Sequence, residues 1–143
     1  MQIDVNSRCC IQSDDFQWRS VSKDRAAPKD WRPFAHFRTL SYALDALVDK
    51  KLCTESELTG LRSLSSQLES TKRRIEELIG NRRDIPVPPE IQKFGCFMTA
   101  AGGLNYSFLK QVWQANSPHE IPQLAEKYVS LATNLAGNYA KNA

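Results

Sequence analysis

The stretch from Thr54 to Ile79 constrains this chain more than any other. Thr54 and Glu57 have the spacing of a capping box, which favours a helix start. Gly80 and Asn81 supply the signal for its end. Between them, apolar or small side chains alternate at spacings of three and four, which predicts one narrow seam along a long helix: Leu61, Leu64, Leu68, Thr71, Ile75 and Leu78. Such a seam needs a covering helix, from this chain or from a second copy.

The residues before that helix predict a small antiparallel sheet. Alternating side chains favour strands over Gln2 to Ser13, Phe16 to Ser22 and Trp31 to Phe37. Thr39 has the place of an N-cap for a helix from Leu40 to about Lys51, and this helix would cover one face of the sheet. The expected fold class is therefore α+β, with an N-terminal three-stranded antiparallel sheet covered by a helix.

Several junctions in this region resemble a family of small phage and prophage proteins. The matching places are the Ser13-Asp14 turn, Trp18 in an aromatic strand, the Phe37-Arg38-Thr39-Leu40 strand-to-helix junction and the helix start Thr54-Glu55-Ser56-Glu57-Leu58. The chain departs from the family pattern in having His36-Phe37 for a tyrosine pair and Thr54-Glu55-Ser56 for Ser-Asp-Ala. The resemblance covers about residues 2–79. It implies an α+β fold and a phage setting, but no activity, because that family has no established function.

A proline-rich connector at 82–89 predicts a boundary between a domain over 1–81, which ends in the long helix, and a helical region over 90–143. We expect a helix from Pro89 to Gly102-Gly103, a short helix capped by Asn105, and a last helix that begins with the capping box Ser117-Pro118-His119-Glu120. The last helix carries a second seam: Ile121, Leu124, Tyr128, Leu131 and Leu135. The matching period favours a C-terminal helical bundle that packs on the long helix, and the same pattern would serve a homodimer.

The region after the connector is poor in charge and rich in large side chains. Depletion of charge together with aromatic residues is typical of the centre of a protein interface, although the same residues also form ordinary cores. Both interpretations stay open for the candidate partner-binding residues, which are Phe94, Phe97, Tyr106, Phe108, Trp113 and Tyr128.

Basic residues give a second candidate surface, for nucleic acid. Aromatic and basic residues interleaved on strands can stack bases and neutralise phosphates, and this describes Trp18, Arg19, Trp31, Arg32 and Arg38. A basic run follows in and after the long helix, at Lys72, Arg73, Arg74, Arg82 and Arg83. At 100° per residue the three helical cations spread widely, and neighbouring glutamates can pair with them, so a solvated helix face is the competing interpretation.

Composition and motifs exclude several classes of protein. The net charge of +3 argues against an acidic mimic of DNA, and no apolar run is long enough to span a membrane. Because the first residues also lack the apolar core of a signal peptide, we expect a cytoplasmic protein of a bacterial host cell. The cysteines Cys9, Cys10, Cys53 and Cys96 and the histidines His36 and His119 have no metal-ligand spacing. No cofactor is therefore expected.

These observations favour a non-enzymatic phage or prophage accessory protein. We expect it to bind and inhibit or modulate a host protein or protein complex, for example a defence complex, in the manner of an anti-CRISPR protein. One alternative is a nucleic-acid-binding accessory protein. The other is a homodimeric structural module joined through the seam from Leu61 to Leu78.

Overall fold

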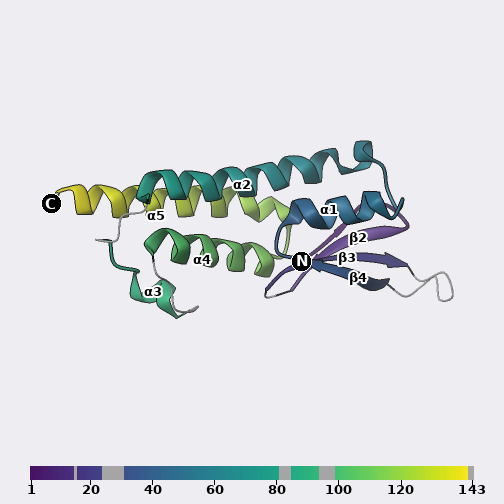
Figure 1. Ribbon diagram of the computed structural model, residues 1–143, viewed down its shortest axis with the longest axis horizontal. Helices are drawn as coiled ribbons and strands as arrows, with labels where there is room; N and C mark the ends of the chain where they lie inside the picture. The colour runs from purple at the N-terminus through teal and green to yellow at the C-terminus, as the bar shows by residue number, and fades with distance from the viewer. Residues whose placement is uncertain (15, 24–30, 81–84, 94–98, 142–143) are drawn as a thin grey trace. The chain divides into compact units, whose positions relative to one another are not determined.

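The protein has an α+β fold in a computed structural model (Figure 1) that describes residues 1–143 except 15, 24–30, 81–84, 94–98 and 142–143. Its strands are β1 (Gln2–Asp4), β2 (Cys9–Ser13), β3 (Trp18–Lys23) and β4 (Trp31–Phe37). Its helices are α1 (Leu40–Asp49), α2 (Thr59–Ile79), α3 (Pro89–Gln92), α4 (Ala100–Gln114) and α5 (Ile121–Lys141). Two 3₁₀ turns, η1 (Glu55–Leu58) and η2 (Pro118–Glu120), precede α2 and α5.

The chain forms two compact units. The first unit comprises Met1–Ser66 and Trp113–Glu120, and the second comprises Gln67–Val112 and Ile121–Ala143. Helices α2 and α4 each contribute residues to both units. The division differs from the sequence-based one, which places the whole of the long helix in an N-terminal domain and the boundary at 82–89.

The sheet has four antiparallel strands in the order β1-β2-β3-β4, so the expectation of three strands is wrong. The first expected strand is instead a hairpin, and Asn6 turns the chain between its two strands. The side-chain oxygen of Asn6 accepts hydrogen bonds from the backbone N–H groups of Arg8 at 2.7 Å and Cys9 at 3.1 Å. An asparagine that bonds its own following backbone in this way favours a turn over a continuous strand.

Helix α1 packs on one face of the sheet and contacts β2, β3 and β4 (Figure 1). The register places Ile11 opposite Ser20, and Ser20 opposite Ala35, so these residues share a face. The hydroxyl of Ser20 is fully buried there and donates to the carbonyl of Ala43 in α1 at 2.8 Å. The polar group is therefore satisfied inside an otherwise apolar layer.

The junction from α1 to α2 follows the sequence signals closely. Thr39 caps α1 by accepting from the N–H of Tyr42 at 3.3 Å, and a carboxylate oxygen of Glu57 accepts from the N–H of Thr54 at 3.1 Å. Arg62, in the first turn of α2, pairs with Asp45 of α1 at 2.7 Å and with Glu55 of η1 at 2.8 Å. These ion pairs fix the start of α2 within the first unit.

The side chains buried along α2 repeat with the period of an ordinary helix. They are Leu61, Ser65, Leu68, Thr71, Ile75 and Ile79. Leu64 and Leu78 of the expected seam are only half-buried. The buried stripe follows 3.6 residues per turn, so it drifts around the helix relative to a strict 3.5-residue repeat.

Helix α4 begins earlier than the sequence signals indicate. Gly102 and Gly103 lie inside its first turn, where they were expected to end the preceding helix. The cap is Thr99, whose hydroxyl accepts from the N–H of Gly102 at 3.0 Å and whose carbonyl accepts from Gly103 at 3.1 Å. Asn105, expected to cap a separate helix, is instead a buried residue of α4. A threonine cap with good geometry has outweighed the low helix propensity of two glycines.

The residues Pro118–Glu120 of the expected capping box form η2, and the last helix starts directly after it at Ile121. Its buried residues are Ile121, Ala125, Tyr128 and Ala132. Leu124 and Leu135 of the expected seam are half-buried, and Leu131 is 38% exposed. These three leucines therefore lie along one edge of the buried stripe of α5.

Two glycines at the ends of α2 should affect stability in opposite directions when each is replaced by alanine. Gly60 lies in the first turn, and the place that a Cβ atom would take there has nothing within 4 Å, so Gly60→Ala should raise the free energy of unfolding by about 0.5–1 kcal/mol. Gly80 has a φ of +64°, a backbone angle that strains other residues. Gly80→Ala should therefore lower the free energy of unfolding by about 1 kcal/mol. Urea unfolding of both variants checks this, and a change of the same sign in both would contradict it.

Candidate partner-binding groove

A groove of about 480 Å³ lies between α3, α4 and α5 in the second unit. We call it the α4–α5 groove, after the two longer helices that contribute its lining residues. Figure 1 shows where these two helices lie in the fold. Its volume is in the range of sites that hold ligands or anchor side chains. The residues that line it are Pro88, Ile91, Lys93, Leu104, Ser107, Gln111, Lys127, Tyr128, Leu131 and Leu135.

Helical spacing explains how the sequence places these side chains together. On α4, Leu104, Ser107 and Gln111 recur at steps of three and four and share one face. On α5, Lys127 and Leu131, and then Leu135, recur at steps of four. The third wall is short, because Pro88 precedes α3 in an extended conformation and the helix itself has four residues.

The floor of the groove is held by a contact between α4 and α5. The rings of Phe108 and Tyr128 are tilted by 55° with their centroids 5.5 Å apart. The hydroxyl of Tyr128 and that of Ser107 are hydrogen-bonded at 2.6 Å, and both side chains are buried. Because the tyrosine combines apolar packing with a satisfied hydroxyl, it fixes the register of the two helices beneath the groove.

Charge around the groove has one sign among the residues that line it. Lys93 and Lys127 are the charged lining residues in the described part of the chain, and no acidic residue is among the described residues that line the groove. The ammonium group of Lys127 lies 5.8 Å from the ring centroid of Tyr128, at the outer limit of a cation–π contact. The groove therefore combines an apolar interior with a cationic rim.

The predicted partner-binding residues divide into three groups. Phe108, Trp113 and Tyr128 are buried, and Tyr106 is half-buried. Phe94 and Phe97 lie outside the described residues. Trp113 belongs to the first unit, where its carbonyl accepts from the hydroxyl of Ser13 at 2.7 Å. Among the four that are described, only Tyr128 lines the groove, as part of its floor.

Sequence reasoning missed the exposed leucines that give the groove its apolar wall. Leu131 is 38% exposed, and Leu135 beside it is half-buried. Both were assigned to a seam that another helix would cover. Their spacing gave the correct face of the helix, but not the extent to which that face is covered.

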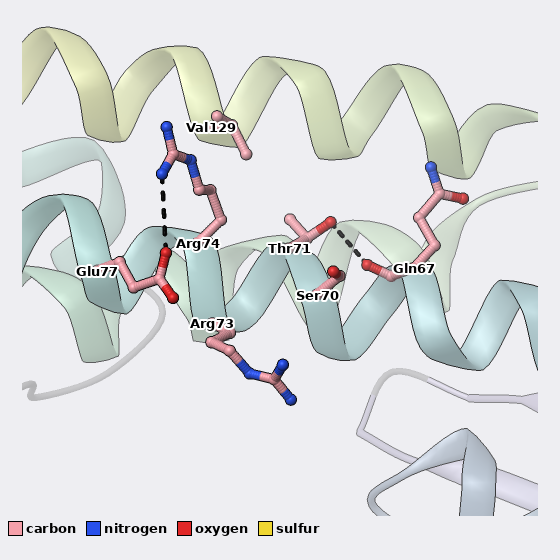
Figure 2. A pocket seen from close by; sticks show the side chains of 7 residues that line it. All are labelled: Gln67, Ser70, Thr71, Arg73, Arg74, Glu77 and Val129. Carbon is pink, nitrogen blue, oxygen red and sulfur yellow. Dashed lines mark hydrogen bonds and ion pairs between the residues drawn. The ribbon is translucent and has the colours of Figure 1, made fainter.

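The basic run on α2 does not form one concentrated patch. A shallow pocket there is lined by Gln67, Ser70, Thr71, Arg73, Arg74, Glu77 and Val129. Figure 2 shows Arg74 reaching toward Val129 on α5 while Arg73 extends to the other side of α2. Arg74 pairs with Glu77 at 3.7 Å, and all three basic residues, including Lys72, are exposed. This is the geometry of a solvated helix face. The other two residues of the predicted basic run, Arg82 and Arg83, lie outside the described residues.

The aromatic residues of the predicted nucleic-acid surface are not both accessible. Trp18 is 1% exposed, so its ring cannot stack on a base in this conformation. Trp31 is half-buried, with the ammonium group of Lys23 4.9 Å from its ring centroid. Of the arginines, Arg32 and Arg38 are exposed and Arg19 is half-buried.

Two buried thiols meet in the first unit. Cys9 and Cys53 are both buried, and the thiol of Cys9 lies 3.7 Å from the carbonyl oxygen of Leu52, which accepts its hydrogen bond. Burial, with a smaller contribution from Cys53, raises the pKa of Cys9 to about 12. Burial likewise raises the pKa of Cys10 to about 11. Thiols in this state are weak nucleophiles and weak metal ligands.

Within the described ranges, no three His, Cys, Asp or Glu side chains are grouped to hold a metal ion.

Comparisons with known protein families, with curated proteins and with solved structures find no match to this chain. Among the described residues, no helix has the length and apolar character needed to cross a membrane.

The burial of Phe108 predicts a loss of stability when its ring is removed. Phe108→Ala should lower the free energy of unfolding by about 3–5 kcal/mol, because it leaves a cavity beneath Tyr128. Urea unfolding measures this, with Tyr106→Ala, at a half-buried position of the same helix, as the comparison. A loss below about 1 kcal/mol for Phe108→Ala would show that its ring is not a core group.

The raised pKa of Cys9 predicts a loss of stability in alkaline solution. A thiol whose pKa is higher in the folded state stabilises fully below its unfolded pKa near 9, and this contribution disappears as pH rises toward about 12. The melting temperature of the protein should therefore fall more steeply between pH 9 and 11 than that of Cys9→Ala. Parallel curves for the two proteins would contradict the assignment.

Proposed function

We propose that this protein is a non-enzymatic accessory protein of a phage or prophage that binds a host protein or protein complex and thereby inhibits or modulates it. The α4–α5 groove is the proposed contact surface. The phage setting rests on the resemblance of residues 2–79 to small phage proteins. The binding role rests on the groove itself.

The observation that carries the proposal is the exposure of Leu131 within an apolar groove. Its side chain is 38% exposed, whereas Tyr128 and Ala132 on the same helix are buried. Apolar side chains that line a hollow and are rimmed by polar groups are typical of sites where a partner inserts its own anchor residues. The lysines and Gln111 supply that rim here.

A protein of this kind acts by occupying a surface on its partner. Occlusion needs a well-packed patch and a fixed backbone, and it needs no reactive group. The contact between Phe108 and Tyr128 supplies the fixed backbone under the groove. A host defence complex, such as a CRISPR effector, is the partner class that the phage resemblance favours.

A pair of variants on one helix tests the proposal. Leu131→Asn removes the apolar wall of the groove. Thr133→Asn makes an equally small change at an exposed position about 200° away around α5. The tagged proteins are used to capture partners from a lysate of a bacterial host treated with nuclease. We expect one protein to be retained in stoichiometric amount by the wild type and by Thr133→Asn, and lost with Leu131→Asn.

Two results would count against this function. Recovery of nucleic acid alone, or of proteins released by nuclease, would favour the nucleic-acid alternative. Equal retention of a partner by both variants would show that binding does not use the groove. Circular dichroism of both variants provides the control for folding.

A further inference from the structure

We infer that the α4–α5 groove receives a short amphipathic helix of the partner, with apolar anchors at helical spacing and acidic residues beside them. This inference rests on the proposed function and names the chemistry of the partner segment. It is carried by the length of the groove, its apolar walls and the sign of its charge.

The length of the groove matches a short helix. Its lining on α5 runs from Lys127 to Leu135, and on α4 from Leu104 to Gln111. At 1.5 Å per residue these spans are about 12 Å and about 10 Å, or roughly two helical turns each. A segment of two to three turns therefore fills the groove, and a helix laid between two others can pack its ridges into their grooves.

The apolar walls have the spacing that such a helix needs. Leu131 and Leu135 on α5 are one turn apart, and they lie along the groove with Leu104 of α4 and Ile91 of α3. Leu104 and Ile91 are buried, while Leu131 and Leu135 keep part of their surface open. Anchors at positions i, i+4 and i+7 of the partner would cover this open apolar surface.

The charge of the lining selects acidic flanking residues. Lys127 belongs to α5, and Lys93 directly follows α3. The nearest acidic residue on α5 is Glu126, which lies roughly opposite the row of Leu124, Leu131 and Leu135 at 100° per residue. The carboxylate of Glu126 therefore does not offset the positive charge of Lys127 in the groove. Charge complementarity then favours glutamate or aspartate beside the anchors, which raises the association rate and orients the segment.

The polar groups of the wall favour a peptide over an acyl chain. Gln111 is half-buried in the wall and carries both a donor and an acceptor. An acyl chain laid against its amide would bury these groups without a partner, which costs binding energy. The side chains of a peptide can pair with them.

Synthetic peptides test this chemistry on the full chain. The first probe is a helical peptide of about 15 residues, long enough for measurable helicity, with leucines at i, i+4 and i+7 and glutamates beside them. The second has lysines in place of the glutamates. Fluorescence anisotropy should show the glutamate peptide binding on the order of tenfold more tightly. Lys127→Glu should reverse this preference, and Lys72→Glu, an exposed position on α2 that does not line the groove, should leave it unchanged.

Other results would overturn the inference. Equal affinity for the two peptides would contradict the inference that the partner segment carries acidic residues beside its anchors. Laurate that binds while the glutamate peptide does not would make the groove a site for anionic amphiphiles. A concentration-dependent dimer that Leu131→Asn abolishes would make the occupant a second copy of the chain.

The host protein captured in the pull-down separates this inference from the proposed function. If Leu131→Asn loses that protein while Lys127→Glu retains it fully, the inference of an acidic partner segment is wrong, and the proposed function is still supported. If Lys127→Glu and Leu131→Asn both lose it, with Lys72→Glu unaffected, both proposals are supported. If all variants retain it, the groove is not the contact surface.

Discussion

The apolar stripe along α2 is the constraint on which both units depend. It runs from Leu61 in the first unit to Ile79 in the second, so each unit owes part of its core to the same helix. Each large apolar side chain buried on this helix contributes about 1.5–3 kcal/mol. The ion pairs of Arg62 fix the start of the stripe and the positive φ of Gly80 ends it. The rest of the chain has to supply surfaces that cover it.

Local signals in the sequence predicted several element ends correctly. Thr39 caps α1 and Gly80 ends α2, because these positions depend on hydrogen bonds and backbone angles within a few residues. The failures have equally local causes. Asn6 divides a stretch of alternating residues into two strands, since its side chain bonds the backbone two and three residues ahead. Thr99 starts α4 before Gly102, and pattern alone does not decide between a cap and a break.

The candidate groove was harder to predict, because burial is a property of the assembled unit. Large aromatic residues in a charge-poor segment are attractive interface candidates. They also remove the most apolar surface from water when they are buried in a core. Tyr128 therefore forms part of the floor of the groove, and the buried ring of Phe108 packs against it. Leu131 stays partly exposed because the contacts of Tyr128 fix how far α5 is rotated. Helical spacing identifies the face that carries a residue, while packing alone determines which edge of that face remains open.

The hydroxyl of Ser13 and the carbonyl of Trp113 meet across 100 residues of sequence. The first unit is therefore discontinuous: its sheet is made early in synthesis, but Trp113–Glu120 joins it only after most of the second unit has left the ribosome. Contacts of such long separation slow folding, because the loop must close before the contact stabilises anything. Neither unit corresponds to a contiguous gene fragment. A chain truncated before residue 113 would leave the sheet without a segment that completes its unit.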